Sequence, residues 1–95
     1  MSHIHLVRKH RLGRKRAAAK VERLRQELSE AHEFEGEWVD EVLHISRAGA
    51  QGDIEVGRDA IEVRVQLGML LRPWRERIQR EIEDHLDTLF PQPDE

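Results

Sequence analysis

Residues 60–90 constrain the fold more than any other stretch, because the spacing of apolar residues changes within them. In residues 60–67 aliphatic side chains alternate with polar ones, which predicts a strand with one buried face: Ile61, Val63, Val65 and Leu67. After Gly68, apolar residues recur every three or four positions, which predicts a helix with one apolar stripe: Leu71, Trp74, Ile78, Ile82, Leu86 and Leu89. Pro73 suits the first turn of that helix, where no amide hydrogen is needed. We expect the strand and the helix to cover part of each other's apolar surface.

The rest of the chain predicts one more helix and four more strands. Helical spacing of apolar residues predicts a helix over residues 13–32. Alternation of residues favours strands at residues 3–8, 34–39, 42–47 and 53–56. Turns are expected between them at Asp40-Glu41, at Gly49 to Gly52 and at residues 57–59.

The order β-α-β-β-β-β-α predicts an α+β fold of two layers. In it, an antiparallel sheet of about five strands carries both helices, antiparallel to each other, on one face. Residues 1–90 are expected to form a single domain, and residues 91–95 a flexible C-terminal tail after the last helix. The pattern leaves the position of the first strand in the sheet open.

The charged residues are unevenly distributed along the chain, although its net charge is only −3. Residues 1–25 contain nine Lys or Arg and one acid, whereas residues 26–95 contain seven Arg and eighteen acids. Both predicted helices begin with basic and end with acidic residues, and each cation at a helix N-terminus costs about 0.3–1 kcal/mol. We therefore expect each basic helix end to lie beside the acidic end of an antiparallel neighbour.

The composition argues against several classes of function. The chain has no cysteine, which excludes disulfides and thiol chemistry and fits a reducing cytoplasm. No run approaches the roughly 18 apolar residues of a membrane span, and the first residues lack the apolar centre of a signal peptide. There is no glycine-rich phosphate loop and no nucleophile motif. We expect a cytoplasmic protein that has no cofactor and is not an enzyme.

The histidines are candidates for a metal site. His3, His5 and His44 lie on the polar sides of two predicted strands, and they could bind zinc or copper if those strands were neighbours. No carboxylate stands at ligand spacing, so surface histidines are the better interpretation and we predict no metal site.

Two other groups of residues are candidate binding sites. The first, which we call the basic end, is a candidate for a partner or an anion: Arg11, Arg14, Lys15 and Arg16. We do not expect it to bind nucleic acid, because the sheet lacks stacking aromatic residues on its polar face. The second group is predicted to line either the core or a cavity between helices and sheet: Trp38, Val65, Leu67, Trp74 and Ile78.

Three segments carry a resemblance to a known family: MSHIHLVRKHRLG, WVDEVLHISRAGAQGDIEVG and VRVQLGMLLRPWRERIQREIEDHLDTLF. Together they span residues 1–90, and the chain resembles the polyhydroxyalkanoic acid system family of small bacterial proteins linked with storage-polyester metabolism. The chain departs from the family at Arg11, where members often carry Ser, and at Asp40, where they often carry Gly. The resemblance implies an accessory or granule-associated role and implies no catalytic residues.

We therefore expect a non-enzymatic accessory protein that acts by protein contacts or at the granule surface. Its partners would be protein components of the polyester storage system or of the granule surface. One alternative is a small domain that binds an acyl or other hydrophobic ligand between helices and sheet, and a third is a nucleic-acid-binding regulator. A homodimer through the open face of the sheet stays undecided, because that face is polar: Glu62, Arg64 and Gln66.

Overall fold

The computed structural model describes residues 2–91, which contain five strands, two α-helices and one 3-10 turn. In chain order these are β1 (Ser2–Lys9), α1 (Gly13–His32), β2 (Glu35–Val39), β3 (Val42–Arg47), β4 (Ala50–Val56), β5 (Ala60–Leu67), η1 (Arg72–Trp74) and α2 (Arg75–Leu89). The predicted tail, residues 91–95, lies outside the described residues apart from Pro91. The element order is the one that the sequence predicts.

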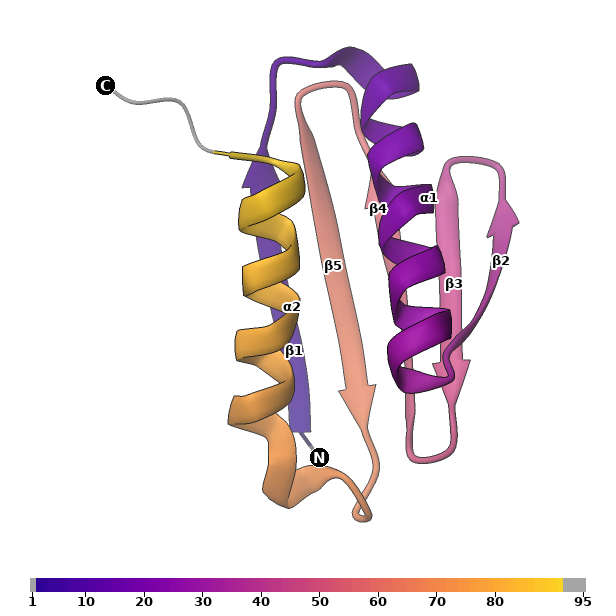
Figure 1. Cartoon of the computed structure of the whole chain (residues 1–95), viewed down its shortest axis with the longest axis vertical. Helices are drawn as coiled ribbons and strands as arrows, with labels where there is room; N and C mark the ends of the chain where they lie inside the picture. The colour runs from indigo at the N-terminus through magenta and orange to yellow at the C-terminus, as the bar shows by residue number, and fades with distance from the viewer. Residues whose placement is uncertain (1, 92–95) are drawn as a thin grey trace.

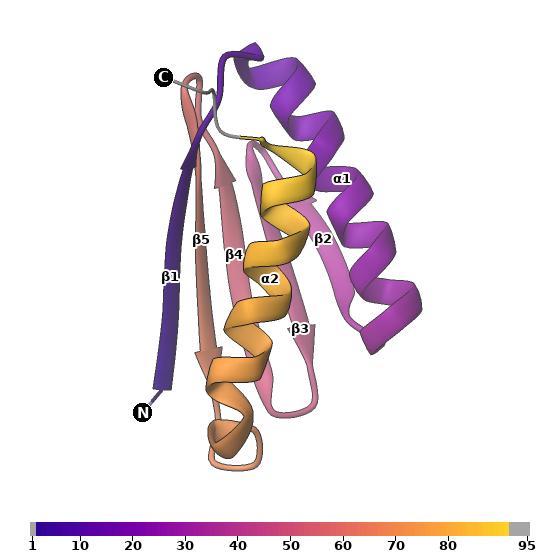
Figure 2. The same cartoon turned by 60° about the vertical axis from the view of Figure 1, so that its left-hand side comes forward.

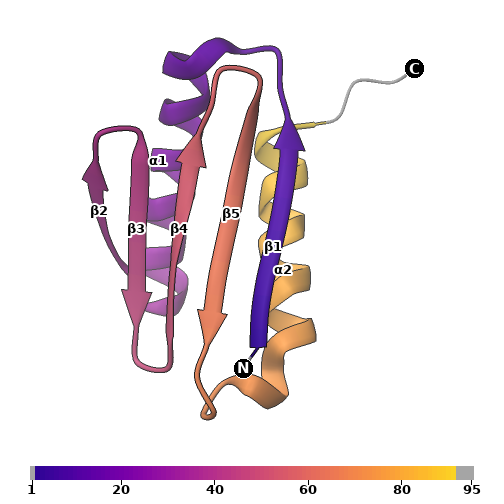
Figure 3. The same ribbon diagram turned by 180° about the vertical axis from the view of Figure 1, so that it is seen from behind.

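The described strands form one antiparallel sheet in the order β1-β5-β4-β3-β2. The strands from β2 to β5 follow one another as hairpins, and β1 joins at the edge of β5 (Figure 3). In this register Ile4 lies opposite Val65 and Leu6 lies opposite Val63, so the apolar residues of both strands face the same side. This pairing places the first strand, which the sequence pattern left open.

The two helices form a second layer on one face of the sheet (Figures 1 and 3). They run in opposite directions, with α2 beside β1 and α1 across β4 and β2 (Figure 2). The predicted α+β fold, with antiparallel helices on one face, is confirmed. Neither helix in the described part of the chain is both long and apolar enough to cross a membrane.

The core lies between the two layers, where the alternating strand residues meet the helix stripes. Its most enclosed side chains come from both layers: Ile4, Val21, Leu24, Leu43, Ile54, Val56, Ile61, Val63, Val65, Leu86 and Phe90. Burying a side chain of this kind contributes about 1.5–3 kcal/mol. The two spacings in the sequence therefore determine which faces meet.

The predicted turn at Gly49 to Gly52 is wrong in part, because β4 starts at Ala50 and includes Gly52. A Cβ atom at position 52 would lie 2.3 Å from the carbonyl oxygen of Arg64 on β5. Glycine is therefore required at position 52 by the close approach of the neighbouring strand and not by a turn.

The second helix also begins later than the apolar spacing predicts. Pro73 lies in η1, and α2 proper begins at Arg75. A 3-10 turn has about three residues per turn, so it breaks the helical spacing before residue 75. Trp74 consequently falls outside the buried stripe and is 53% exposed, which corrects its assignment to the apolar face of a regular helix.

The glutamates that face the other helix contact histidines instead of the arginines that we expected. His32 near the end of α1 pairs with Glu81 of α2 at 3.1 Å, and His85 of α2 pairs with Glu27 of α1 at 3.0 Å. These pairs join the antiparallel helices along their sides.

The charged helix ends find partners on other elements. Arg14 in the first turn of α1 pairs with Glu41 in the β2–β3 turn at 3.2 Å, and Arg8 of β1 pairs with Asp87 of α2 at 3.3 Å. Because α2 lies beside β1, Asp87 near its acidic end pairs with a cation of the strand. The basic end of α1 is therefore not neutralised by α2 in the way that we expected.

Candidate functional site

A pocket of about 330 Å³ opens between the helices near the end of the molecule where β5 leads into α2. Its sheet side is formed by Ile45, Val65 and Leu67, and α2 contributes Ile78 and Ile82. Most of the lining is apolar, and the volume lies near the lower end of the range for ligand clefts, about 300–1,000 Å³. The pocket can therefore hold a small apolar group.

Four polar residues line this pocket, and we call them the polar rim: His32, Arg47, Arg77 and Glu81. Glu81 pairs with His32, and Nη1 of Arg47 donates a hydrogen bond to the backbone oxygen of His32 at 3.0 Å. Arg77 precedes Glu81 by one helical turn and so lies on the same side of α2. The rim therefore carries one carboxylate and two arginines, which are always positively charged.

The two arginines of the polar rim are held differently. Arg47 is the last residue of β3, and its guanidinium lies 5.7 Å from the centre of the Phe34 ring. Its enclosed Nε has no acceptor among residues 2–91. Arg77 is exposed and forms neither an ion pair nor a hydrogen bond with any residue in the described range. Only Arg77 is available to a ligand without breaking a structural contact.

An exposed apolar segment stands beside the pocket, and we call residues 68–74 the apolar loop. Met69 is 88% exposed and Leu70 is 71% exposed, while Trp74 also lines the pocket. Arg72 within the loop and Arg77 after it are exposed as well. The loop therefore combines large apolar side chains with nearby positive charge, which is the composition of segments that bind to interfaces.

Backbone hydrogen bonds fix the apolar loop in place. The amide of Gly68 donates to the carbonyl of Gly49 at 2.9 Å, and the amide of Leu71 donates to Gly68 at 3.2 Å. Gly49 has a φ of +85°, and a Cβ there would lie 3.1 Å from Cγ of Leu71. The β3–β4 turn thus supports the loop, and its exposed side chains are held outward by the fold.

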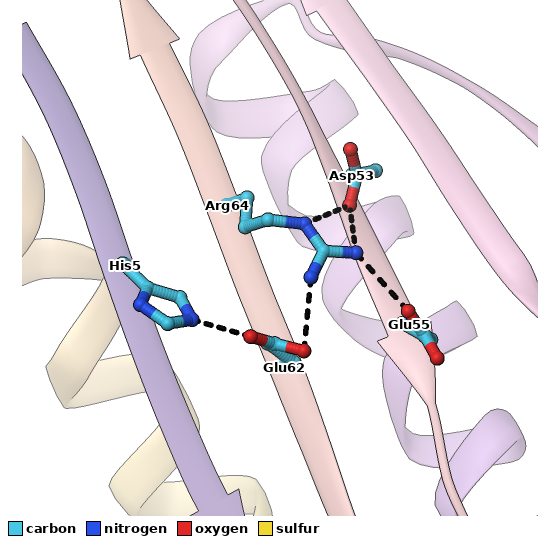
Figure 4. A network of polar contacts seen from close by, with 5 residues as sticks. All are labelled: His5, Asp53, Glu55, Glu62 and Arg64. Carbon is cyan, nitrogen blue, oxygen red and sulfur yellow. Dashed lines mark hydrogen bonds and ion pairs between the residues drawn. The ribbon is translucent and has the colours of Figure 1, made fainter.

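The opposite, uncovered face of the sheet carries a network of charges (Figure 4). Nη2 of Arg64 lies 2.9 Å from Asp53 and 3.1 Å from Glu55, and Nη1 lies 2.9 Å from Glu62, which also contacts His5. The hydrogen bond with His5, together with Arg64, lowers the pKa of Glu62. The carboxylates, Glu55 foremost, raise the pKa of Arg64. This mutual pairing is typical of a solvated, self-satisfied surface.

Trp38 lies on β2, away from the residues that line the pocket. Its Nε1 donates a hydrogen bond to Glu22 of α1 at 2.8 Å, and Arg25 donates to the same carboxylate at 2.8 and 2.6 Å. Arg25 first and Trp38 second lower the pKa of Glu22 to about 2. Of the predicted cavity residues, Val65, Leu67, Trp74 and Ile78 are brought together at the pocket, and Trp38 instead joins α1 to the edge of the sheet.

The basic end lies at the start of α1, and all four of its residues are exposed. Arg14 pairs with Glu41, whereas Lys15 and Arg16 form no ion pair within the described part of the chain. The helix start here has no side-chain cap. The basic end is thus an open patch at the end of the molecule opposite the apolar loop (Figure 1).

The histidines are not gathered into one site. β1 and β3 are separated in the sheet by β5 and β4, so His44 cannot meet His3 and His5. Within residues 2–91 no group of three or more His, Cys, Asp or Glu side chains is placed to hold a metal ion.

Sequence spacing missed two parts of the site. Met69 and Leu70 were expected within the second helix, yet they lie in a loop that no element covers. The signal was present in the run MLL, because Met69 and Leu70 do not belong to the apolar stripe that begins at Leu71. The link from His32 to Arg47 and Glu81 could not be found from spacing, because it joins three separate elements.

Residues 4–90 match the family model described as putative polyhydroxyalkanoic acid system protein. The chain belongs to this family. The match covers almost the whole of the described structure, and it confirms the resemblance seen in the three sequence segments. A search of the curated proteins found no match.

The fold of this family member is similar to that in the NMR structure of PA4090 from Pseudomonas aeruginosa. The TM-score is 0.64 at 15% sequence identity, and the alignment covers 98% of this chain and 88% of that chain. The likeness shows a shared fold.

Proposed function

We propose that this protein is a non-enzymatic accessory protein of polyester storage that docks on the granule surface through the apolar loop. Membership of the polyhydroxyalkanoic acid system family supports the connection to the polymer. The observation that carries the proposal is the exposure of Met69 and Leu70 on a loop whose backbone is hydrogen-bonded to Gly49. An ordered protein exposes such side chains at a cost, which contact with a hydrophobic surface would recover.

Contact with a polyester surface would bury both side chains and leave the neighbouring arginines at the water boundary. Burying each of Met69 and Leu70 is worth about 1.5–3 kcal/mol. Arginine stems can lie along an apolar surface while their charged heads stay in water, so Arg72 is compatible with this orientation. No opening of the two-layer core is needed, because the apolar stripes of α1 and α2 remain inside.

The test is co-sedimentation of the purified protein with granules from a polymer-producing cell and with protein-free particles of the same polyester. The variant Met69→Ser/Leu70→Ser should lose at least about tenfold in affinity for both, because it removes two buried apolar side chains. The matched control is Val7→Ser/Val39→Ser, which alters two half-exposed side chains away from the loop and should bind like the unaltered protein.

Two results would contradict surface docking through the loop. Equal binding of both double variants would show that the loop is not the contact. Binding to native granules but not to protein-free particles would show that the partner is a granule protein and not the polymer.

A second function has its own support in the pocket between the helices. We propose that this pocket binds the hydrocarbon part of an acyl compound, because its lining is mostly apolar and its volume is about 330 Å³. Its lining among the described residues includes no Ser, Thr or Cys nucleophile, which favours binding over covalent chemistry. The variant Ile78→Trp, which adds bulk inside the pocket, should abolish binding of a short acyl compound measured by calorimetry.

A further inference from the structure

We propose that the pocket selects acyl chains that end in a free carboxylate, and that Arg77 is the residue that distinguishes the acid from its neutral ester. This inference rests on the second proposed function, binding of a hydrocarbon chain in the pocket, and adds the chemistry of the head group.

The first support is the arrangement of polar and apolar groups. The lining includes Val65, Leu67 and Ile82 together with the four residues of the polar rim, three of which are joined through His32. A ligand that fills this space would have one apolar body and one polar end. That is the shape of an aliphatic acid and not of a ligand that is polar throughout.

The second support is charge. The only carboxylate of the polar rim, Glu81, already faces His32 at 3.1 Å, and Arg47 already donates to the carbonyl of that histidine. Arg77 forms no such contact with a described residue. The rim therefore has an unmatched positive charge, and a planar guanidinium binds a carboxylate with two parallel hydrogen bonds.

The third support is the balance of solvation. Arg77 is exposed, so a carboxylate paired with it would keep part of its hydration while the chain leaves water. A neutral ester would gain the same apolar contacts but no charged hydrogen bond. A cationic amphiphile of equal length would meet repulsion from both rim arginines. Free hydroxyalkanoates, the acids of which the storage polyester is built, belong to the favoured class.

The experiment follows the two indole N–H signals of the chain, which has two tryptophans, by NMR during titration. The probes are 3-hydroxyoctanoate, its methyl ester and octyltrimethylammonium. We expect the signal of Trp74, assigned with Trp74→Phe, to shift saturably with the acid, and the ester to bind at least about tenfold more weakly. The signal of Trp38 should stay in place.

Two variants decide the role of the arginine. Arg77→Gln should lower the affinity for the acid to that for the ester and leave the ester unchanged. Arg80→Gln alters an exposed arginine of α2 that does not line the pocket, and it should change neither the affinity for the acid nor that for the ester.

Equal affinities for acid and ester in the unaltered protein, or an acid preference that survives Arg77→Gln, would overturn the inference while the pocket function stands. If neither the acid nor the ester binds to the unaltered protein, the proposed function of the pocket is overturned as well. Granule sedimentation, which tests the apolar loop, should be unaffected by Arg77→Gln.

Discussion

At the scale of single residues, Glu22 is the most strongly perturbed acid among those whose pKa shift is resolved. Its carboxylate accepts hydrogen bonds from Arg25 and Trp38, and its pKa falls from the ordinary 4.5 to about 2. A lowered pKa means that the folded state keeps the carboxylate charged where the unfolded chain binds a proton. The contribution of Glu22 to stability is therefore complete above pH 4.5 and is lost as the pH falls towards 2.

This gives a pH-dependent prediction for Glu22→Gln. Because the Glu22 side chain is about one-third exposed and solvent screens the pair, we expect a loss of only about 1 kcal/mol near neutral pH. The difference from the unaltered protein should shrink as the pH falls from 4.5 towards 2, measured by urea unfolding. Glu30→Gln, at an exposed position of α1, serves as the control. A difference that stays constant with pH would show that the charge of Glu22 is not the cause.

Asp40 shows how one residue can record a departure from a family pattern. It occupies the β2–β3 turn with a φ of 55°, in the left-handed region that favours glycine. The family resemblance leads us to expect Gly in this turn, and the positive φ is a conformation that glycine adopts without strain. Asp tolerates this region better than most side chains, so the hairpin keeps its register with Val39 opposite Val42.

At the scale of elements, Gly52 shows what a strand glycine contributes. A Cβ there would lie 2.3 Å from a backbone oxygen of β5, which cannot move without disturbing the ladder. We expect Gly52→Ala to destabilise the protein by about 2–3 kcal/mol, as overpacking of a rigid site does.

The matched control for this strand is Gly36→Ala on β2. A Cβ at Gly36 would lie 2.7 Å from Cγ and Cδ of Arg25, whose hydrogen bonds to Glu22 would have to adjust as the side chain moves. We expect its cost to be smaller than that of Gly52→Ala, because the added Cβ meets a side chain and not a backbone atom. Equal midpoints of urea unfolding for the two variants would contradict the proposed role of backbone approach at position 52.

The elements themselves were largely predictable, and the reasons lie in their spacing. Alternation in β5 and helical spacing in α1 each leave only one face that can be buried, so type and direction follow from the sequence. The role of Gly52 and the 3-10 turn before α2 were harder to predict from the sequence. Gly52 can signal a turn or a close strand neighbour, and Pro73 fits the first turn of a 3-10 helix as well as that of an α-helix.

At the scale of the whole molecule, the candidate site was only partly predictable. Val65, Leu67, Trp74 and Ile78 were expected to face the space between helices and sheet, since periodicity assigns each to an inner face. Whether that space is filled depends on how far apart the helices lie, and no local pattern records that distance. The polar rim is likewise a product of tertiary placement, because its members come from α1, β3 and α2.

The two ends of the molecule differ in character, and this leads to the last prediction. The apolar loop lies where β5 meets α2, and the basic end lies at the opposite end, at the start of α1 (Figure 1). If the loop docks on polyester, the long axis of the molecule stands away from the surface and the basic end faces water.

Met69 should then be shielded from peroxide when the protein is bound to granules, and its oxidation should be slowed by about tenfold or more, as burial at an interface would cause. Acylation of Lys15 should proceed at the same rate in free and bound protein, which peptide mass spectrometry can measure in the same sample. Protection of Lys15 with continued oxidation of Met69 would mean that the basic end makes the contact, and that the exposed loop serves some other partner.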